Sequence, residues 1–338
     1  KDIAKAEMIK ANVPVVPGSE GLIQSIDDAK KTAKKIGYPV IIKATAGGGG
    51  KGIRVARDEK ELETGYRMTQ QEAETAFGNG GLYLEKFIEN FRHIEIQIIG
   101  DTYGNVIHLG ERDCTIQRRM QKLVEEAPSP VLSEDKRQEM GNAAIRAAKA
   151  VNYENAGTIE FIYDLDDNQF YFMEMNTRIQ VEHPVTEMVT GVDLVKLQLK
   201  VAMGEALPFK QEDISINGHA IEFRINAENP YKNFMPSPGK ITQYLAPGGF
   251  GVRIESACYT NYTIPPYYDS MVAKLIVHEP TREESIMTGI RALSEYLVLG
   301  IDTTIPFHLR LLNNHIFRSG EFNTKFLEKY NIMDDNNQ

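Results

Sequence analysis

Residues 157–176, with the sequence GTIEFIYDLDDNQFYFMEMN, contain two runs of β-branched and aromatic residues separated by a polar segment. The runs GTIEFIYD and QFYFMEMN have the composition of strands, and DLDDN between them is rich in residues that favour a turn. We therefore predict a β-hairpin, whose strands run antiparallel. Together with the helical segments around it, this hairpin favours an α+β fold over a doubly wound parallel sheet.

The predicted hairpin carries three oxygen-bearing side chains that can meet on one face. Glu174 and Asn176 are two residues apart in the second run, so they share a face, and Glu160 in the first run can lie across from them. An acceptor-rich set of this kind suits Mg²⁺, which keeps positions free for phosphate oxygens. For an isolated hairpin, a solvent-exposed polar face would explain the same pattern.

Two charged segments flank the hairpin in the sequence. The segment NTRIQVEHPVTEM (176–188) is too polar for a core strand, and it gathers Arg178, Gln180, Glu182 and His183. The segment ERDCTIQRRMQKLVEEAP (111–128) gathers Arg112, Arg118, Arg119, Lys122, Glu125 and Glu126, and taken alone it is typical of a solvated surface. Zinc-protease histidine spacing and a G-x-S-x-G elbow are absent, which excludes those two kinds of hydrolysis.

Residues 17–84 have the pattern of a small α/β module. Capping signals at Ser25 and Asp58 begin two helices, and the short β-rich runs PVIIKA (39–44) and IRVAR (53–57) lie between them. Consecutive glycines at 47–50 join the two runs.

The glycine loop has two interpretations. Its backbone N–H groups can approach a phosphate closely, and Lys43 at the end of the preceding run would add a positive charge. A flexible loop with a solvated lysine has the same local sequence. A P-loop is excluded, because Lys51 is followed by Gly52 instead of Ser or Thr and a strand follows instead of a helix.

The rest of the chain mixes helices and strands. We predict a half-buried strand at HIEIQIIG (93–100), because isoleucines alternate there with polar residues, and a helix from Ser133 to about Asn152. Further predictions are hairpin-like strands at AIEFRIN (220–226) and KITQYL (240–245), a helix from Thr281 through Leu297, and a disordered tail at DDNNQ (334–338).

Composition limits the function classes. The 338 residues are 42% hydrophobic and 25% charged, as in a packed globular protein, and 38 basic against 47 acidic residues give a net charge of −9. Nucleic acid is therefore an unexpected partner. Two cysteines cannot form a disulfide framework, which fits a reducing, cytoplasmic compartment, and no stretch has the length of a membrane span.

Several long motifs in one order carry a resemblance to a known family. They are YPVIIKATAGGGGKG, RHIEIQ, ERDCTIQRR, QKLVEEAPSP, EMNTRIQVEHPVTEMVTG, EFRINAE and PSPGKI. Together they resemble the biotin carboxylase family of the ATP-grasp superfamily over nearly the whole chain. The resemblance implies an ATP-grasp fold with a connecting helix (1–16), a small α/β lid (17–84), a large α+β domain with an antiparallel sheet (85–330) and a tail (331–338).

The resemblance also implies a nucleotide and metal site. Lys1 and Lys43 would contact the phosphates of ATP, and Gly49 and Gly50 would close over them. The remaining members of this site would be Glu85, Lys86 and Ile88 at the adenine, His93 and Gln117 at the ribose, and Glu160, Glu174 and Asn176 at Mg²⁺ or Mn²⁺.

A second implied site takes bicarbonate and biotin. Bicarbonate would be bound by Lys122, Arg178, Gln180 and Val181. Glu182 would deprotonate it, ATP would convert it to carboxyphosphate, and Arg224 would stabilise the biotin enolate. Phosphoryl transfer of this kind needs positioning and charge neutralisation, which this set of residues supplies.

The implied activity is the ATP-dependent carboxylation of biotin, the first half-reaction of acetyl-CoA carboxylase in fatty acid synthesis. The chain lacks an A-M-K-M biotin-acceptor segment, so the implied partners are a biotin carboxyl carrier protein and carboxyltransferase subunits, with the enzyme itself a homodimer. The alternatives are the corresponding domain of pyruvate carboxylase and an ATP-grasp module that binds nucleotide without turnover.

Two features depart from the family pattern. Position 120 is Met where relatives commonly have His near the ribose, so nucleotide affinity is expected to differ. Family members also have a further N-terminal domain before the position of Lys1; a molecule without that domain would be expected to fold and react less well.

Overall fold

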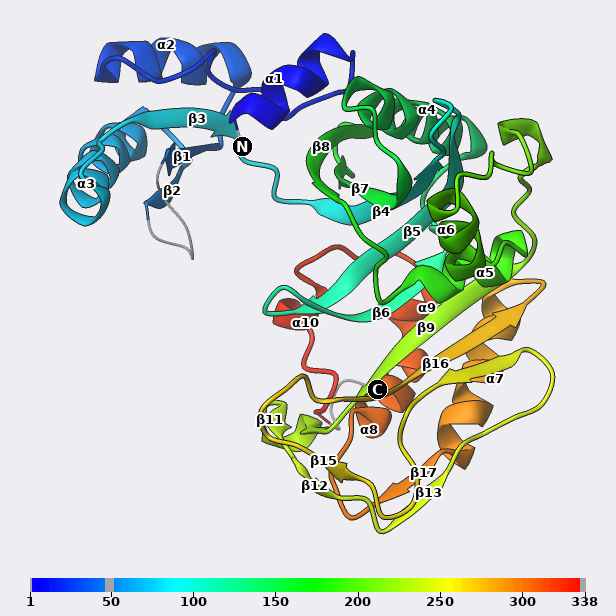
Figure 1. Cartoon of the computed structure of the whole chain (residues 1–338). Coiled ribbons are helices and arrows are strands. Elements are labelled where there is room, and N and C mark those ends of the chain that lie inside the picture. Colours follow the sequence, from blue (N-terminus) through cyan, green and yellow to red (C-terminus); the bar gives the residue numbers. More distant parts are fainter. Residues whose placement is uncertain (1, 46–51, 335–338) are drawn as a thin grey trace.

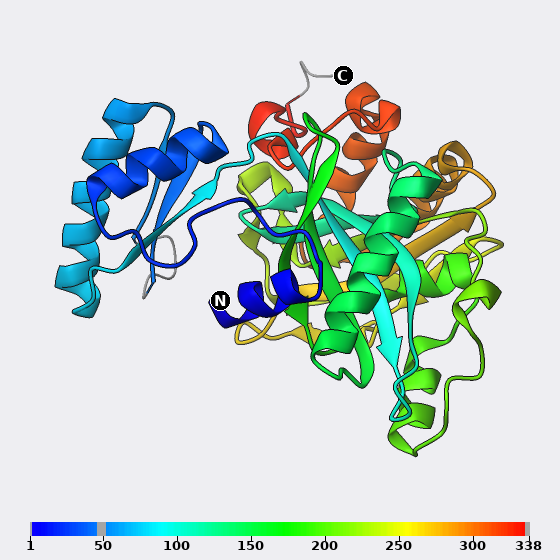
Figure 2. The same cartoon turned by 90° about the horizontal axis from the view of Figure 1, so that it is seen from above.

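The computed structural model describes residues 2–45 and 52–334. Two bodies are apparent, a small module built on a three-stranded sheet and a larger body built on an eight-stranded sheet (Figures 1 and 2). The helix α1 (Asp2–Lys10) precedes the small module in the chain but lies against α4 of the larger body.

The small module comprises α2 (Ile26–Ile36), β1 (Val40–Ala44), β2 (Ile53–Ala56), α3 (Glu59–Phe77) and β3 (Leu82–Lys86). The sheet order is β2-β1-β3, with both neighbours antiparallel to β1. Both helices start where we predicted, because Ser25 Oγ accepts a hydrogen bond from Asp28 N at 3.2 Å and Asp58 Oδ1 accepts one from Glu61 N at 2.8 Å.

The boundary of this module lies slightly beyond the predicted position. The strand β3 continues to Lys86, so the predicted boundary between residues 84 and 85 falls inside a strand. The ladder with β1 explains the extension, because it pairs Lys86 with Val40 at the start of the central strand. Glu85 and Lys86 are therefore held by the small sheet.

The larger sheet has the order β14-β16-β9-β6-β5-β4-β7-β8, and every neighbouring pair is antiparallel. This arrangement confirms the predicted α+β class. Its strands are β4 (Phe91–Gly100), β5 (Val106–Arg118), β6 (Gln121–Ala127), β7 (Asn155–Asp164), β8 (Gln169–Asn176), β9 (His219–Asn226), β14 (Val252–Glu255) and β16 (Met271–Glu279). The hairpin predicted at 157–176 is the pair β7–β8.

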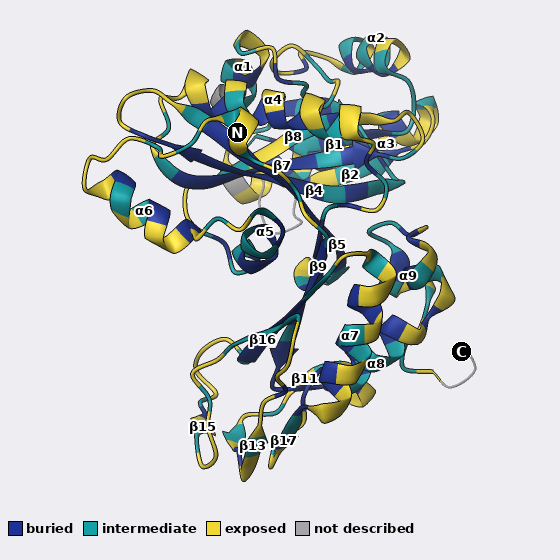
Figure 3. Ribbon diagram, turned by 90° about the vertical axis from the view of Figure 1, so that its right-hand side faces the viewer, coloured by how far each residue is buried: buried dark blue, intermediate teal, exposed yellow. Residues whose placement is uncertain are grey.

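The two faces of this sheet differ in chemistry. One face is apolar and is covered by α4 (Glu134–Ala150), α7 (Arg282–Glu295) and α8 (Ile305–Asn313). Buried residues of α4 pack in one core with Ile96 of the sheet, and those of α7 and α8 pack in another with Phe223. The other face is covered in part by α5 (His183–Thr190) and α6 (Leu194–Ala202). Most of the sheet is buried (Figure 3).

The face under α5 carries a row of charged residues, which we call the charged row. Its members lie opposite one another in the strand registers: Glu174 and Glu160, Glu160 and Glu95, Glu95 and Arg112, Glu125 and Glu222, Arg224 and Lys274, and Lys274 and Glu255. Side chains directly opposite each other on one face of a sheet are close enough to interact. The row therefore sets the geometry of the site.

Short elements complete the fold. The β-bridges and short strands are β10 (Glu228–Asn229), β11 (Met235–Pro236), β12 (Gly239–Lys240), β13 (Gln243–Leu245), β15 (Thr263–Ile264) and β17 (Leu297–Leu299), and the last helices are α9 (His315–Ser319) and α10 (Phe326–Lys329).

Three predictions about individual segments were wrong. The strand at 93–100 is buried on both faces instead of one, and segment 111–128 lies largely inside the protein, with Arg112 and Glu125 fully buried. In both cases charged side chains neutralise one another across strands. The segments 220–226 and 240–245 contain strands but are not parts of hairpins, because β9 pairs with β6 and β16, and β12 and β13 pair with β15 and β17. The predicted disordered tail at 334–338 lies outside the described residues, except Asp334.

Two connections cross between the small module and the larger body, and both contact the β7–β8 hairpin. On the incoming connection, Phe172 N donates a hydrogen bond to Pro14 O at 2.7 Å. On the outgoing connection, Asn90 Nδ2 donates to Asp166 Oδ1 at 2.7 Å and Leu165 N donates to Asn90 O at 2.9 Å. The hairpin thus anchors the chain on each side of the small module.

Candidate active site

The β7–β8 hairpin brings together the three predicted metal ligands. Glu160 lies directly across from Glu174 in the register, and Asn176 Nδ2 donates a hydrogen bond to Glu160 Oε1 at 3.0 Å. Glu160 is buried, whereas Glu174 lies on the outermost strand and is exposed. The set therefore combines one fixed carboxylate with one that solvent can reach.

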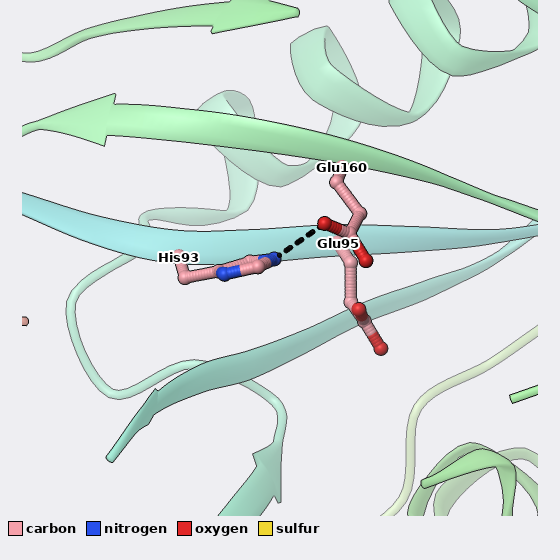
Figure 4. A group of neighbouring side chains, drawn as sticks. All are labelled: His93, Glu95 and Glu160. Atoms are coloured by element: carbon pink, nitrogen blue, oxygen red, sulfur yellow. Dashed lines mark ion pairs between the residues drawn. The ribbon is translucent and has the colours of Figure 1, made fainter. Parts of the chain in front are cut away.

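A histidine extends this group on the neighbouring strand. His93 Nε2 lies 3.0 Å from Glu160 Oε2, and Figure 4 shows the imidazole pointing toward the carboxylate. Gln117 Nε2 is 2.8 Å from His93 Nδ1. The two residues predicted to face the ribose therefore lie in contact with each other, and His93 also contacts the hairpin.

Glu160 belongs to two groups of side chains that could bind a metal ion, the hairpin set described above and a second set on the neighbouring strand. Donor atoms of His93, Glu95 and Glu160 lie within 4.8 Å of one another. However, Glu95 is already compensated by cations, since its oxygens lie 2.5 Å from Arg112 Nε and 2.7 Å from Lys122 Nζ. The hairpin set, with hard oxygen donors and one solvent-accessible carboxylate, fits Mg²⁺ better.

Lys122 is the central cation of the site. Its Nζ lies 2.5 Å from Glu182 Oε1, 2.7 Å from Glu95 Oε2 and 3.4 Å from Glu160 Oε1. Burial alone would lower the pKa of Lys122, but the surrounding anionic groups raise that pKa well above its usual value. Lys122 therefore remains an ammonium ion that joins the metal hairpin to Glu182.

Glu182 lies between two cations. It is buried at the N-terminal cap of α5, and its Oε2 accepts a hydrogen bond from Arg224 Nη2 at 2.9 Å while Oε1 faces Lys122. Arg224 in turn binds Glu125 through Nε at 2.6 Å. The structure thus places the predicted base beside both predicted cations.

Gln180 and Val181 directly precede Glu182, and both make hydrogen bonds with charged side chains of the large sheet. Gln180 Nε2 donates to Glu160 Oε1 at 3.0 Å, and the Gln180 carbonyl oxygen Oε1 accepts from Arg112 Nη2 at 3.1 Å. Val181 offers its backbone oxygen, which accepts a hydrogen bond from Lys274 Nζ at 2.7 Å.

Arg178 is the predicted bicarbonate ligand that the structure does not bring into this group. Its side chain is exposed, and its Nη1 donates to the backbone oxygen of the adjacent Ile179 at 3.2 Å. Arg178 lies two residues after the last residue of β8, so no strand pairing directs it toward the charged row.

Three of the residues predicted for the nucleotide, Lys43, Glu85 and Lys86, lie on strands β1 and β3 of the small module. Glu85 binds two lysines, Lys43 at 2.5 Å and Lys5 at 2.8 Å. Lys86 donates to the backbone oxygen of Tyr38 at 3.0 Å. The remaining predicted members are Ile88, which is buried, and Lys1, Gly49 and Gly50, which lie outside the described residues.

Charge pairing outweighs burial at two carboxylates of the site and lowers the pKa of both. Burial would raise the pKa of Glu95, but Arg112 and Lys122 outweigh that effect and lower its pKa to about 2. Burial also opposes ionisation of Glu160, yet His93, Lys122 and Gln180 lower its pKa to about 2. Both side chains are therefore anionic at neutral pH.

Sequence reasoning missed several members of the charged row. Arg112 is fully buried and binds Glu95 at 2.5 Å and Gln97 at 2.7 Å, and Lys274 lies 2.6 Å from Glu255. The period-two alternation of RHIEIQ placed Glu95 and Gln97 on one strand face, which was a usable signal. The position of Arg112 depended on strand pairing that a single sequence does not reveal.

The comparisons with known proteins agree with this geometry. Residues 1–210 match the family described as "Carbamoyl-phosphate synthase L chain, ATP binding domain", and residues 222–329 match the family described as "Biotin carboxylase C-terminal domain". The protein is thus an ATP-grasp enzyme, and the predicted ATP-grasp fold is confirmed.

Individual relatives narrow the assignment. Biotin carboxylase 1 of Bacillus subtilis (strain 168) is 65% identical over 333 residues, which cover 98% of this chain and 74% of that protein. A pyruvate carboxylase subunit of Methanothermobacter thermautotrophicus is 56% identical, and the match covers 98% of this chain and 67% of that protein. The chain therefore belongs to the biotin carboxylase family, as its motifs indicated.

A solved structure supports the same assignment. The biotin carboxylase domain dimer of Hydrogenobacter thermophilus 2-oxoglutarate carboxylase, in complex with MgADP, ADP and bicarbonate, is 53% identical and matches with a TM-score of 0.85. The match covers 99% of this chain and 74% of the Hydrogenobacter thermophilus chain. In the described residues, none of the helices is long and apolar enough to cross a membrane.

Proposed function

We propose that this protein carboxylates biotin, with bicarbonate as the carbon source and ATP as the source of energy. The observation that carries the proposal is the continuous contact from Glu160 through Lys122 and Glu182 to Arg224. Binding ATP alone requires no such connection between a metal hairpin and a buried base. Relatives named biotin carboxylase, at up to 65% identity, support the same activity.

The nucleotide and its metal would bind between the small module and the hairpin. Lys43 and Lys1 would bind phosphate oxygens, and the backbone around Glu85, Lys86 and Ile88 would take the adenine. Glu160, Glu174 and Asn176 would hold Mg²⁺ or Mn²⁺. The metal ion, when bound, would neutralise the phosphate charges. The MgADP complex of the Hydrogenobacter thermophilus relative supports a magnesium nucleotide as the ligand.

Bicarbonate would bind beside Lys122, Gln180 and the backbone of Val181. Glu182 Oε1 would accept the bicarbonate proton, so that the resulting dianion attacks the γ-phosphorus of ATP. The products of this step are carboxyphosphate and ADP. Because Lys122 Nζ is 2.5 Å from Glu182, the ammonium would also lie near the anion as it forms. Arg178 would need to turn inward to contribute.

Biotin would be carboxylated on the other side of Glu182. Decomposition of carboxyphosphate gives CO2 and phosphate, and that phosphate removes the N1 proton of biotin. Arg224 would stabilise the negative charge on the ureido oxygen, since its guanidinium is a fixed cation. The N1 anion then attacks CO2 to give carboxybiotin.

The partners follow from the chemistry. Biotin would arrive on a carrier protein, and carboxyltransferase subunits would consume the carboxylated carrier, as in acetyl-CoA carboxylase. The homodimeric relative supports a dimer. A second assignment, the biotin carboxylase subunit of a pyruvate carboxylase, is favoured by the 56% identical Methanothermobacter thermautotrophicus relative, and both assignments share the half-reaction described above.

A direct assay tests the activity. The full chain is incubated with Mg-ATP, labelled bicarbonate and free biotin, and acid-labile label on biotin is measured. We expect label that depends on both ATP and biotin. Nucleotide binding without labelled product would overturn the proposal and identify a binding module instead.

A further inference from the structure

Two buried glutamates of the charged row have no role in the proposed reaction. Glu125 in β6 and Glu222 in β9 lie directly opposite each other in the strand register, and both are fully buried. Within the described part of the chain, neither oxygen of Glu222 takes part in a hydrogen bond, and neither does Glu125 Oε2. Buried polar atoms without partners are uncommon and need an explanation.

The charges around Glu125 and Glu222 explain why these buried oxygens have no hydrogen-bond donor among the other described side chains. Two facing carboxylates away from water are both ionised only when each is paired with a cation. Of this pair only Glu125 forms an ion pair among the described residues, so one of the two retains a proton. Arg224 contacts Glu125 through Nε at 2.6 Å and Nη2 at 2.5 Å, which favours the anion on Glu125. The proton then resides on Glu222, which lies opposite Glu125 in the register, and its O–H would donate to Glu125 Oε2. One shared proton would thus give both residues a partner.

The remaining charged groups near Glu222 do not change this assignment. Lys274 and Arg224 favour its ionised form, while Glu125 and Glu182 oppose it. Burial dominates and raises the pKa of Glu222 well above its usual value, with Glu125 as the next contribution. Burial also raises the pKa of Glu125, but only to about 7, because Arg224 opposes the shift. Glu125 therefore loses its proton first.

We propose that Glu125 is a positioning residue for Arg224, and that Glu222 supports it as a neutral hydrogen-bond donor. Glu125 and Glu182 together engage Nε and Nη2 of the guanidinium. Among the described residues, none forms a hydrogen bond with Nη1, so this nitrogen is available for the oxygen that becomes negative on biotin. The inference rests on the proposed role of Arg224 toward biotin.

The experiment compares two substitutions at equally buried positions. E125Q removes the anion that orients Arg224, whereas E222Q replaces one neutral group with another that can still donate a hydrogen bond. Each full-length variant is assayed for carboxybiotin over a range of biotin concentrations, and separately for its KM for ATP. Thermal unfolding checks that both variants fold.

We expect E125Q to lower kcat/KM for biotin by at least about 30-fold while the KM for ATP changes less than about 2-fold, since one charge-assisted contact is lost near biotin only. E222Q should lose less than about 3-fold by the same reasoning. E125D, which keeps the charge, should recover part of the loss.

Two outcomes are distinguishable. If E125Q and E222Q lose biotin turnover equally, or if E125Q raises the KM for ATP as much as it lowers turnover, the positioning role is wrong. R224A serves as the reference for the proposed function. If R224A carboxylates biotin at the normal rate, the role of Arg224 itself is wrong, whatever the two glutamine variants do.

Discussion

The large sheet and the small module prepare their charged residues in different ways. On the large sheet, Lys122 and Arg224 both contact Glu182 at the start of α5, and strand pairing fixes the positions of the two cations. In the small module, Lys43 is bound to Glu85 and must leave that carboxylate before it can reach a phosphate. The proposed bicarbonate and biotin site is therefore largely preorganised, whereas the proposed nucleotide site would be assembled when the ligand binds.

Substitution of one lysine in each region should give the largest difference in stability and activity between the two regions. K122M leaves three carboxylates without their shared cation, so we expect the free energy of unfolding to fall by about 3–5 kcal/mol and carboxylation to fall at least about 100-fold. K43M removes a partly exposed ion pair and should change the free energy of unfolding by less than about 1 kcal/mol while raising the KM for ATP.

Urea titrations and ATP titrations of both variants provide the measurement, and K122R serves as the charge-retaining control for folding. Equal losses of stability in K122M and K43M would show that the two regions do not differ in the way described.

The next largest effect should be a loss of folding stability at acidic pH, when a carboxylate of the charged row takes up a proton. The pKa of Glu95 is about 2 in the folded protein against an ordinary 4.5, so its stabilising contribution is complete above about pH 5 and is lost as the pH falls from 4.5 toward 2. The contribution is about 3 kcal/mol for a difference of this size. Urea unfolding measured from pH 6 to pH 3 should therefore show a steep loss of stability.

A pair of variants isolates that contribution. E95Q should be less stable than the native chain at pH 7 but should depend less on pH below 4.5. E59Q is the control, because Glu59 has a lowered pKa through Lys30 and Lys34 but lies at the surface, where solvent screens the ion pairs, so its removal should change the pH profile much less than E95Q does. An E95Q profile parallel to that of the native chain would contradict the assignment.

The metal hairpin should show a smaller, metal-specific effect. E174Q removes the exposed carboxylate across from Glu160, so the Mg²⁺ concentration needed for half-maximal ATP cleavage should rise about 10-fold. E154Q changes an exposed glutamate just before β7 and should leave that concentration unchanged. An unaltered Mg²⁺ requirement in E174Q would remove Glu174 from the ligand set.

Hydrogen exchange should reveal the smallest difference between the regions. Mg-ATP should slow exchange of amides in residues 17–45 and 52–86 several-fold, because the small module closes over the nucleotide, while amides in β4 and β5 should change little. The same slowing in both regions, or none in either, would contradict the assembly of the nucleotide site on binding.

Local signals predicted much of the fold. The starts of α2, α3, α4 and α7 follow from Ser25, Asp58, Ser133 and Thr281, since a cap depends only on residues three positions away. The order of the eight strands involves pairs such as β6 and β9, far apart in sequence, and local periodicity carries no information about them.

For the site, the sequence predicted which residues belong together but not which charged residues are buried. The i, i+2 spacing placed Glu174 and Asn176 near Glu160, and the family motifs supplied Lys122, Glu182 and the rest as a set. The buried charges were misjudged, because polar residues that alternate with isoleucines usually face water. Only the register shows that Arg112 meets Glu95 in the interior, where each offsets the cost of burying the other.

The two connections between the small module and the larger body determine where the small module could turn relative to the hairpin β7–β8. Both Pro14 and Asn90 are held to it by hydrogen bonds, so the proposed closure of the small module over a nucleotide would turn about an axis alongside the hairpin. Points near an axis of rotation travel the shortest path. Opening and closing would therefore sweep the far end of the module through a wide arc and leave the carboxylate of Glu160 almost stationary.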